Sequence, residues 1–205
     1  MLEDAIFYFI ERGEPLSDNT KAISKLLFEV SMLKHTMRTG YAFLGSGKES
    51  AAAHSFNTAF IAYVLGKMTP GVDVNRMVLM ALIHDIPEAR TGDANAVHKR
   101  YITRDEKRAF EDAIRDTFLS KELLELYQEY EKAETREAML VQDADQIDML
   151  LSLREQEDCG NPNASMWIPF VKNRLKTEQA KSLADTITKT HWASWWMDGF
   201  KKNPS

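Results

Sequence analysis

Apolar residues recur three and four positions apart through most of the chain, and this spacing restricts the possible folds more than any other feature. The pattern is clearest in ISKLLFEVSMLKH, SFNTAFIAYVLGKM and MLVQDADQIDMLLSL. Such spacing places an apolar stripe along one face of a helix. No segment shows the sustained alternation that indicates a half-buried strand. We therefore predict an all-α fold, a bundle of about eight to ten helices.

Clusters of Gly, Pro, Asn and Asp separate the helical segments. They lie at residues 13–19, 40–47, 69–73, 92–96 and 160–163, and they favour turns over helices. The helices that follow such breaks are predicted to be capped by Asp18 or Asn19, Ser50, Asp73 and Thr103. The sequence has no internal repeat, and its 205 residues can bury a substantial core. We therefore expect a single domain over residues 1–205.

The composition disfavours several classes of protein. Apolar residues make up 44% of the chain and charged residues 28%, as in ordinary globular proteins. A net charge of -5 disfavours binding of a nucleic-acid polymer, which needs clustered Lys and Arg. Cys159 is the only cysteine, so a metal would have to be held by His and carboxylates. Because no apolar run approaches the roughly 20 residues of a membrane span, and MLEDAIFYFIERGE is unlike a secretory signal, we expect a cytoplasmic protein without membrane contacts.

The C-terminal segment HWASWWMDGF contains three of the four tryptophans. Trp192, Trp195 and Trp196 lie at helical spacing along one side. We expect a closing helix that packs on the core. A contact in a dimer is the alternative.

The segment LIHDIPEARTGD places a histidine and an aspartate after the apolar run MVLMA. We expect His84 and Asp85 to continue the same buried helix. An ionised carboxylate in such surroundings costs several kcal/mol unless a positive group meets it. The nearest cations in the sequence, Arg76 and Arg90, lie outside the apolar stretch. A bound divalent metal would supply the missing charge.

Two further residues with metal-binding side chains lie in apolar helical patterns. His54 belongs to SAAAHSFNTAFIAYVLG, where small alanines allow close helix packing, and Asp145 belongs to LVQDADQIDMLLSL. Together with His84 and Asp85 they would provide two imidazoles and two carboxylates from three helices. Mixed ligands of this kind suit Mn, Fe, Co, Ni or Zn rather than Ca.

The order of His54, the adjacent His84 and Asp85, and then Asp145 resembles the signature of the HD-domain metal-dependent phosphohydrolases. The segments LKHTMRTGY, AAHS, LIHDIPEARTGD and QDADQIDML are similar to the branch that contains the 5'-deoxynucleotidases. The resemblance covers a core of about residues 33–153, with flanking helices at both ends. It implies that the single domain is an HD domain.

The resemblance also implies roles for individual residues. His54, His84, Asp85 and Asp145 would hold the metal, Glu88 would take part in proton transfer, and Arg38 and Asp93 would shape the phosphate site. Asp143 and Asp148 compete with Asp145 as ligands, but only Asp145 stands in the family's Ala-Asp word. Glu88 follows His84 by four residues, which places both on one helix face, although Pro87 should break that helix. Tyr41 is a candidate for stacking on a base, with a packing role as the alternative.

The function expected from these residues is metal-dependent release of phosphate from (deoxy)nucleoside 5'-monophosphates. The alternatives are hydrolysis of nucleoside triphosphates or of cyclic and signalling nucleotides, and a non-catalytic module that binds a ligand and is stabilised by its metal. We expect one divalent ion, because two-metal relatives use further histidines between the His-Asp pair and the last Asp, where only His98 lies. We also expect a homodimer.

Overall fold

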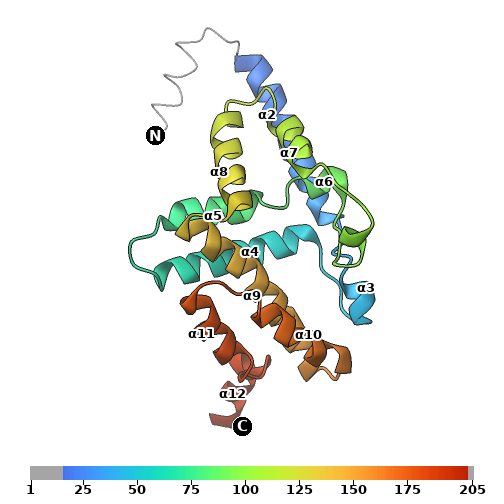
Figure 1. Ribbon diagram of the computed structural model, residues 1–205, viewed down its shortest axis with the longest axis vertical. Helices are drawn as coiled ribbons and strands as arrows, with labels where there is room; N and C mark the ends of the chain where they lie inside the picture. Colours follow the sequence, from blue (N-terminus) through green and yellow to red (C-terminus); the bar gives the residue numbers. More distant parts are fainter. Residues whose placement is uncertain (1–15, 203–205) are drawn as a thin grey trace.

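The computed structural model describes residues 16–202, which form helices and loops without a strand (Figure 1). Nine of the α-helices in this range have nine or more residues, so the prediction of an all-α bundle is confirmed. None of the described helices combines the length and the apolar character that a membrane crossing requires. In chain order the elements are α2 (Leu16–Ser31), the 3-10 helix η1 (Met32–Lys34), α3 (Tyr41–Leu44), α4 (Ala51–Lys67), α5 (Val74–Ile83), α6 (Glu88–Thr91), the 3-10 helix η2 (His98–Arg100), α7 (Glu106–Ile114), α8 (Ser120–Lys132), α9 (Arg136–Asp158), α10 (Pro162–Lys172), α11 (Glu178–Ile187) and α12 (Ser194–Lys202).

Two of the predicted helix caps are confirmed. The Ser50 side chain accepts a hydrogen bond from the backbone N–H of Ala53 at the start of α4. Asp73 does the same for the N–H of Arg76 in α5. Each cap satisfies a donor that the first turn of a helix leaves unpaired.

The other two predicted caps are wrong. Asp18 and Asn19 lie inside α2, because that helix already begins at Leu16. The cap of α7 is Asp105 rather than Thr103, and its side chain accepts a hydrogen bond from the third N–H of the helix. A carboxylate placed directly before the first turn also interacts favourably with the helix dipole.

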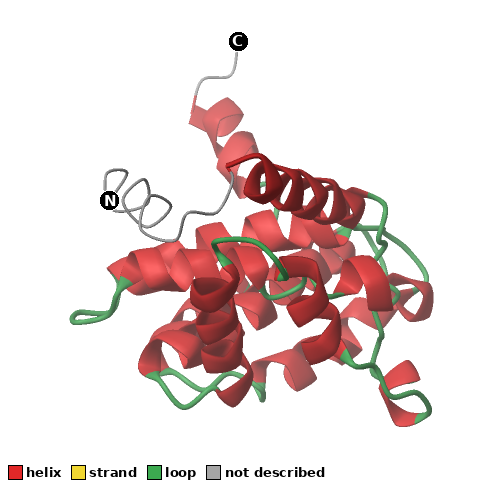
Figure 2. Ribbon diagram, turned by 90° about the horizontal axis from the view of Figure 1, so that it is seen from above, coloured by secondary structure: helices red, strands yellow, loops and turns green. Residues whose placement is uncertain are grey.

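The long helix α9 is the centre of the bundle and packs against α4, α5, α8, α10 and α11 (Figure 1). Figure 2 shows the helices from above, connected by loops. Helices α4 and α5 form a hairpin joined by residues 68–73. A Cβ atom on Gly66 would lie 3.0 Å from Cγ2 of Val74, so the missing side chain lets the two helices approach closely. The largest fully buried aliphatic side chains of α4, α5 and α9 are Leu65, Met77, Met80, Leu140, Ile147, Leu150 and Leu153.

The chain leaves helix α5 earlier than the sequence suggested. The helix ends at Ile83, and His84 is its C-cap. The N–H of Glu88 bonds to the carbonyl of Asp85 at 3.0 Å, a tighter turn than that of an α-helix. The N–H of His84 still bonds to the Met80 carbonyl, so the expectation that the helix continues is wrong only for Asp85, and the break near Pro87 is confirmed.

The C-terminal helix α12 does not close the core. The side chain of Trp195 is 82% exposed, and Trp192 and Trp196 are each 39% exposed. Figure 1 shows α12 at the far end of the molecule, beyond α11. The prediction that this helix packs on the core is wrong, because the rings of Trp195 and Trp196 are exposed to solvent in the part of the chain that the structure describes.

Candidate functional site

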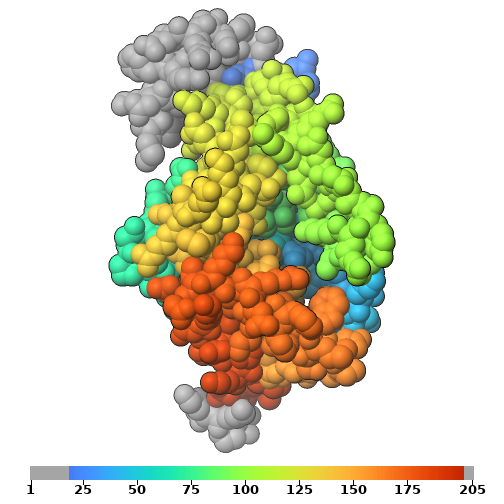
Figure 3. Space-filling model, viewed as in Figure 1, coloured from blue at the N-terminus to red at the C-terminus, as the bar shows by residue number. Residues whose placement is uncertain are grey.

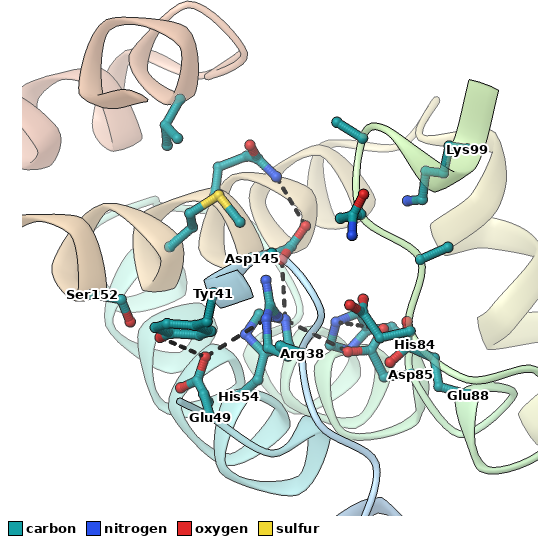
Figure 4. Close-up of a pocket in the computed structure, with 18 of the residues that line it drawn as sticks. Arg38, Tyr41, Glu49, His54, His84, Asp85, Glu88, Lys99, Asp145 and Ser152 are labelled. Carbon is teal, nitrogen blue, oxygen red and sulfur yellow. Dashed lines mark hydrogen bonds and ion pairs between the residues drawn. The ribbon is translucent and has the colours of Figure 1, made fainter. Parts of the chain in front are cut away.

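The four candidate metal ligands converge where α4, the end of α5 and α9 meet (Figure 4). Nε2 of His54 lies 3.1 Å from Oδ1 of Asp145 and 3.6 Å from Oδ2 of Asp85. Nε2 of His84 lies 3.3 Å from Oδ1 of Asp85, and the two imidazole centroids are 5.3 Å apart. Residues 91 positions apart in the sequence therefore form one cluster.

Hydrogen bonds on the opposite ring nitrogens orient both imidazoles. Nδ1 of His54 lies 2.6 Å from Oδ2 of Asp148, and Nδ1 of His84 lies 2.7 Å from the carbonyl oxygen of Ala81. When each Nδ1 donates its proton, each Nε2 presents a lone pair. Nε2 of His84 is buried without a hydrogen-bond partner. Lone pairs and carboxylate oxygens thus face one another, which is unfavourable unless a cation lies between them.

This donor set fits a divalent metal. Ligand atoms about 2.1 Å from one ion lie roughly 3.0–3.4 Å from their neighbours in tetrahedral or octahedral arrangements. The distances from His54 to Asp85 and Asp145, and from His84 to Asp85, are close to that range. His54, His84 and Asp85 also each offer one ligand atom within 4.8 Å of the others. The orphaned Nε2 of His84 is the atom that such an ion would satisfy.

The charges of the site favour a cation at the same place. Burial alone would lower the pKa of His54, but hydrogen bonds to Asp145 and Asp148 raise it to about 10. Burial would raise the pKa of Asp145, yet His54 and Arg38 hold it well below its usual range. The two shifts are opposite sides of one interaction: the carboxylates favour a positive charge on His54, and the positive charges of His54 and Arg38 favour an ionised Asp145.

The two competing aspartates of α9 contact other groups. Asp143 accepts hydrogen bonds from the backbone N–H groups of Lys176 and Thr177, both at 2.8 Å, so it stabilises the start of α11. Asp148 binds the outer nitrogen of His54, and Glu49 completes a second cluster with these two residues. Because Nδ1 of His54 is engaged by Asp148, that cluster orients the imidazole rather than offering a free nitrogen.

The cluster opens into a cavity of about 740 Å³. The surface is hollowed there, between the green segment around α6 and the orange α10 (Figure 3). Helices α3, α9 and α10 contribute an apolar wall to this cavity. The residues of this apolar wall are Tyr41, Phe43, Leu44, Met149, Leu153, Trp167, Phe170 and Val171.

Arg38 lines the cavity beside the cluster, and its side chain is only 14% exposed. Its Nε lies 3.6 Å from Oε2 of Glu49. Burial lowers the pKa of Arg38, but Asp145 and Asp85 more than compensate and keep the guanidinium charged. A charged guanidinium in a cavity can bind phosphate oxygens through paired N–H donors.

Tyr41 also lines the cavity, and its hydroxyl lies 3.4 Å from the carboxylate of Glu49. A Cβ atom on Gly47 would lie 2.8 Å from the Tyr41 ring, so the backbone of that loop packs directly on the ring. The phenol is thus held by its neighbours. Its stacking on a base stays a prediction.

Glu88 stands on α6 at the edge of the cluster, and its Oε2 is buried without a hydrogen-bond partner. Burial and the nearby charges of Asp85 and Asp93 raise the pKa of Glu88 to about 8, against the opposing effect of Arg104 and Arg38. A carboxyl group with a pKa near neutrality is suited to proton transfer.

Asp93 holds two loops together at the mouth of the cavity. Its Oδ2 accepts hydrogen bonds from the N–H of Thr39 at 2.5 Å and from the Thr39 hydroxyl at 2.7 Å. Asn95 donates to the same hydroxyl through its backbone N–H at 3.1 Å. Asp93 therefore has a structural role in the loop, and its other carboxylate oxygen remains the candidate for a substrate contact.

Several cavity residues were not identified from the sequence. The ring of Tyr130 packs edge-on against His84 at 5.3 Å, and Nε2 of Gln146 donates to Oδ2 of Asp145 at 3.0 Å. Arg104 reaches Glu88 from the loop before α7. Tyr130 is part of a helical apolar pattern, and such a pattern does not distinguish a cavity residue from a packing residue. No spacing rule connects Arg104 with Glu88.

Known proteins share this arrangement of helices. Residues 30–187 match a family described as HD domain. A protein named 5'-deoxynucleotidase HDDC2 from Bos taurus is 34% identical over 140 residues, which are 64% of this chain and 66% of that protein. Its namesake from Mus musculus is 32% identical over 151 residues, or 71% and 75% of the two chains. The solved structure of a conserved hypothetical protein from Pyrococcus furiosus has a TM-score of 0.66 and 28% identity, and the alignment covers 80% of this chain and 98% of that one.

Proposed function

The chain belongs to the HD-domain family, and from that premise we propose that it is a metal-dependent hydrolase releasing phosphate from (deoxy)nucleoside 5'-monophosphates. The relatives named 5'-deoxynucleotidase support this substrate class. One observation carries the proposal. The orphaned Nε2 of His84 faces the carboxylates of the cluster, in a cavity that also holds Arg38 and Glu88.

In this proposal His54, His84, Asp85 and Asp145 hold one divalent ion. A divalent ion bound there would polarise a phosphate oxygen and acidify a water molecule. Asp148 keeps the proton on Nδ1 of His54 and so keeps Nε2 free to coordinate. The carbonyl of Ala81 does the same for His84.

Arg38 and Glu88 supply the remaining chemistry. The Arg38 guanidinium binds the non-bridging phosphate oxygens and compensates the charge that develops on them. Glu88 either accepts a proton from the attacking water or donates one to the leaving 5'-oxygen. Its raised pKa keeps a substantial fraction protonated near neutral pH, which favours donation. The products are a nucleoside and inorganic phosphate.

The apolar wall of the cavity is where the nucleoside would lie. Tyr41, Phe43 and Trp167 offer aromatic surface on this wall, and aromatic rings stack on any base without reading its identity. Asp93 is assigned to the phosphate side through its second carboxylate oxygen. Discrimination between one base and another would therefore depend on few polar contacts.

Further parts of the proposal concern the protein as a whole. We assign one HD domain to residues 1–205, supported by the match over residues 30–187. We propose Mn, Co, Fe, Ni or Zn as the metal, since imidazoles and carboxylates together suit these ions. A homodimer in the cytoplasm is proposed, and exposed aromatic rings on α4 and α12 offer surface for self-association.

A phosphate-release assay over a panel of substrates tests the function. Deoxyribonucleoside and ribonucleoside 5'-monophosphates are compared with 3'-monophosphates, triphosphates and cyclic nucleotides, each with Mn²⁺, Co²⁺ and Zn²⁺. We expect turnover of the 5'-monophosphates and loss of turnover after chelation. Preferential cleavage of triphosphates or cyclic nucleotides would change the substrate class. Thermal stabilisation by metal without any turnover would instead favour a non-catalytic module.

A further inference from the structure

Arg104 lies on the loop between η2 and α7, directly before the Asp105 cap of α7. Its side chain is only 10% exposed although it carries a full charge. A buried guanidinium must find anionic or carbonyl partners to offset its lost hydration. Its partners therefore indicate what this residue does.

The guanidinium of Arg104 contacts three groups. Nη1 donates to the carbonyl oxygen of Gly92 and lies 3.7 Å from Oε1 of Glu88. Nη2 pairs with the carboxylate of Glu106 in the first turn of α7. Arg104 thus connects both ends of the α6 segment to the start of another helix.

The contact with Gly92 matters because of the backbone conformation there. Gly92 has φ +71° and ψ 163°, a region that is essentially restricted to glycine. The next residue is Asp93, which binds both the N–H and the hydroxyl of Thr39. The Gly92 carbonyl that Arg104 binds therefore belongs to the turn that aims Asp93 at the neighbouring loop.

The contact with Glu88 has a different consequence. Glu88 has one carboxylate oxygen near Arg104 and the other buried without a hydrogen-bond partner. A carboxyl group held from one side keeps its second oxygen directed elsewhere, and both groups line the cavity. Arg104 itself has both terminal nitrogens engaged by protein groups, which leaves it poorly placed to bind phosphate.

We propose that Arg104 is a positioning residue, which holds the Glu88 carboxylate and the Gly92 turn in the arrangement that proton transfer requires. The proposal rests on the function proposed above. It assigns to Arg104 an effect on the chemical step that is exerted through Glu88, rather than a direct contact with substrate.

The test compares R104Q and R104K with R100Q as the matched control. Arg100 lies four residues earlier, is exposed, and its guanidinium contacts only the Tyr101 ring among the interactions described for it. With 2'-deoxyadenosine 5'-monophosphate and Mn²⁺, we expect R104Q to lower kcat about 10- to 100-fold with KM changed less than about threefold. R104K should fall between R104Q and the wild type, and R100Q should match the wild type. Metal content should be unchanged in all three, and R100Q should also keep the wild-type melting curve.

A double-mutant cycle with E88Q distinguishes positioning from a general structural role. If Arg104 acts through Glu88, the E88Q/R104Q double variant should be no slower than E88Q alone. Multiplicative losses, a higher KM with normal kcat, or wild-type activity of R104Q would each overturn the proposal. If R104Q does not fold, the same cycle with R104K decides.

Hydrogen exchange provides a readout that does not depend on turnover. Amides of residues 92–97 should exchange faster in R104Q than in the wild type, because the Gly92 carbonyl loses the Arg104 guanidinium and keeps only the Thr91 hydroxyl, at 3.3 Å, as a donor. A wild-type protein that releases no phosphate from any nucleotide would refute the proposed function. Unchanged exchange in R104Q would refute the role of Arg104 in the turn.

Discussion

The two walls of the cavity are built differently. The inner wall is formed by α4, the end of α5 and α9, which are the most extensively packed helices of the described chain, and it presents His54, His84 and Asp145. The outer wall is formed by loops around residues 36–50 and 92–105. Hydrogen bonds such as those between Asp93 and Thr39 join its two segments.

This difference separates two tasks. Metal ligands must be held within a few tenths of an ångström, and side chains on packed helices achieve this. Groups that meet a substrate have to let it enter and leave, and loops tied by a few polar contacts permit that. Changes in the inner wall should therefore abolish chemistry. Changes in the outer wall should alter binding, apart from Arg38, which compensates charge in the transition state, and Arg104, which acts through Glu88.

The largest effect is expected from removing a ligand of the inner wall. The H54A and D85A variants should lose bound metal and lower kcat about 10³-fold or more, because the ion contributes several kcal/mol to the transition state. Metal analysis and phosphate release measure the two losses. Folded variants that keep both metal and activity would show that these residues do not form the centre.

The next effect is expected at Glu88, where the inner and outer walls meet. E88Q should retain the metal while kcat falls about 10²- to 10⁴-fold, since a positioned acid or base contributes that much. Metal content should equal that of the wild type. Loss of metal from E88Q would instead identify Glu88 as a ligand.

A smaller effect is expected from Asp148, which contacts the nitrogen of His54 that faces away from the metal cluster. D148N should weaken metal affinity about 10- to 100-fold, because a neutral amide orients the His54 imidazole less strongly than a carboxylate. Competition with a fluorescent chelator measures the affinity. The neighbouring D143N variant is the control, since Asp143 contacts the start of α11 rather than the cluster, and an equal loss in both variants would contradict the assignment.

A change confined to the outer wall should act on KM. T39V removes the hydroxyl that donates to Asp93 and accepts from Asn95. If the equivalent of one hydrogen bond, about 0.5–1.5 kcal/mol, is lost from substrate binding, KM rises roughly 2- to 12-fold, with metal content unchanged. Initial-rate kinetics test this, and a fall in kcat with constant KM would show that the contact between Thr39 and Asp93 acts on the chemical step.

The smallest effect is expected on the exposed C-terminal helix. W195A should change the free energy of unfolding by no more than about 0.5 kcal/mol, because the ring is mostly exposed. L150A, at a fully buried position of α9, should cost about 2–5 kcal/mol. Urea unfolding at two protein concentrations compares them. A large, concentration-dependent effect of W195A would place that ring in an interface between copies.

Much of the fold was predictable because helical periodicity is a local property. The apolar spacing predicted an all-α bundle, and the Ser50 and Asp73 caps follow from short-range hydrogen bonds. The prediction for the Trp-rich segment was wrong for the same reason. Its pattern indicates an amphipathic helix but does not state whether any part of the molecule covers the apolar side.

The candidate site was predictable only where the residue type was itself unusual. A histidine and acids within apolar patterns indicated a buried cation site, and the structure brings His54, His84, Asp85 and Asp145 together. The separate tasks of Asp145 and Asp148 could not be assigned from spacing. They depend on which nitrogen of His54 each carboxylate meets, and that is a matter of helix rotation and distance.

The sequence by itself determined the helices and the residues able to bind a metal, because backbone hydrogen bonding and the cost of burying charge act through residue type. Only the tertiary structure decided which loop residues join them. Arg104 reaches Glu88, and Asp93 reaches Thr39, across gaps in the sequence that no local rule spans. Such contacts arise from the way long helices pack, and packing is a property of the whole chain.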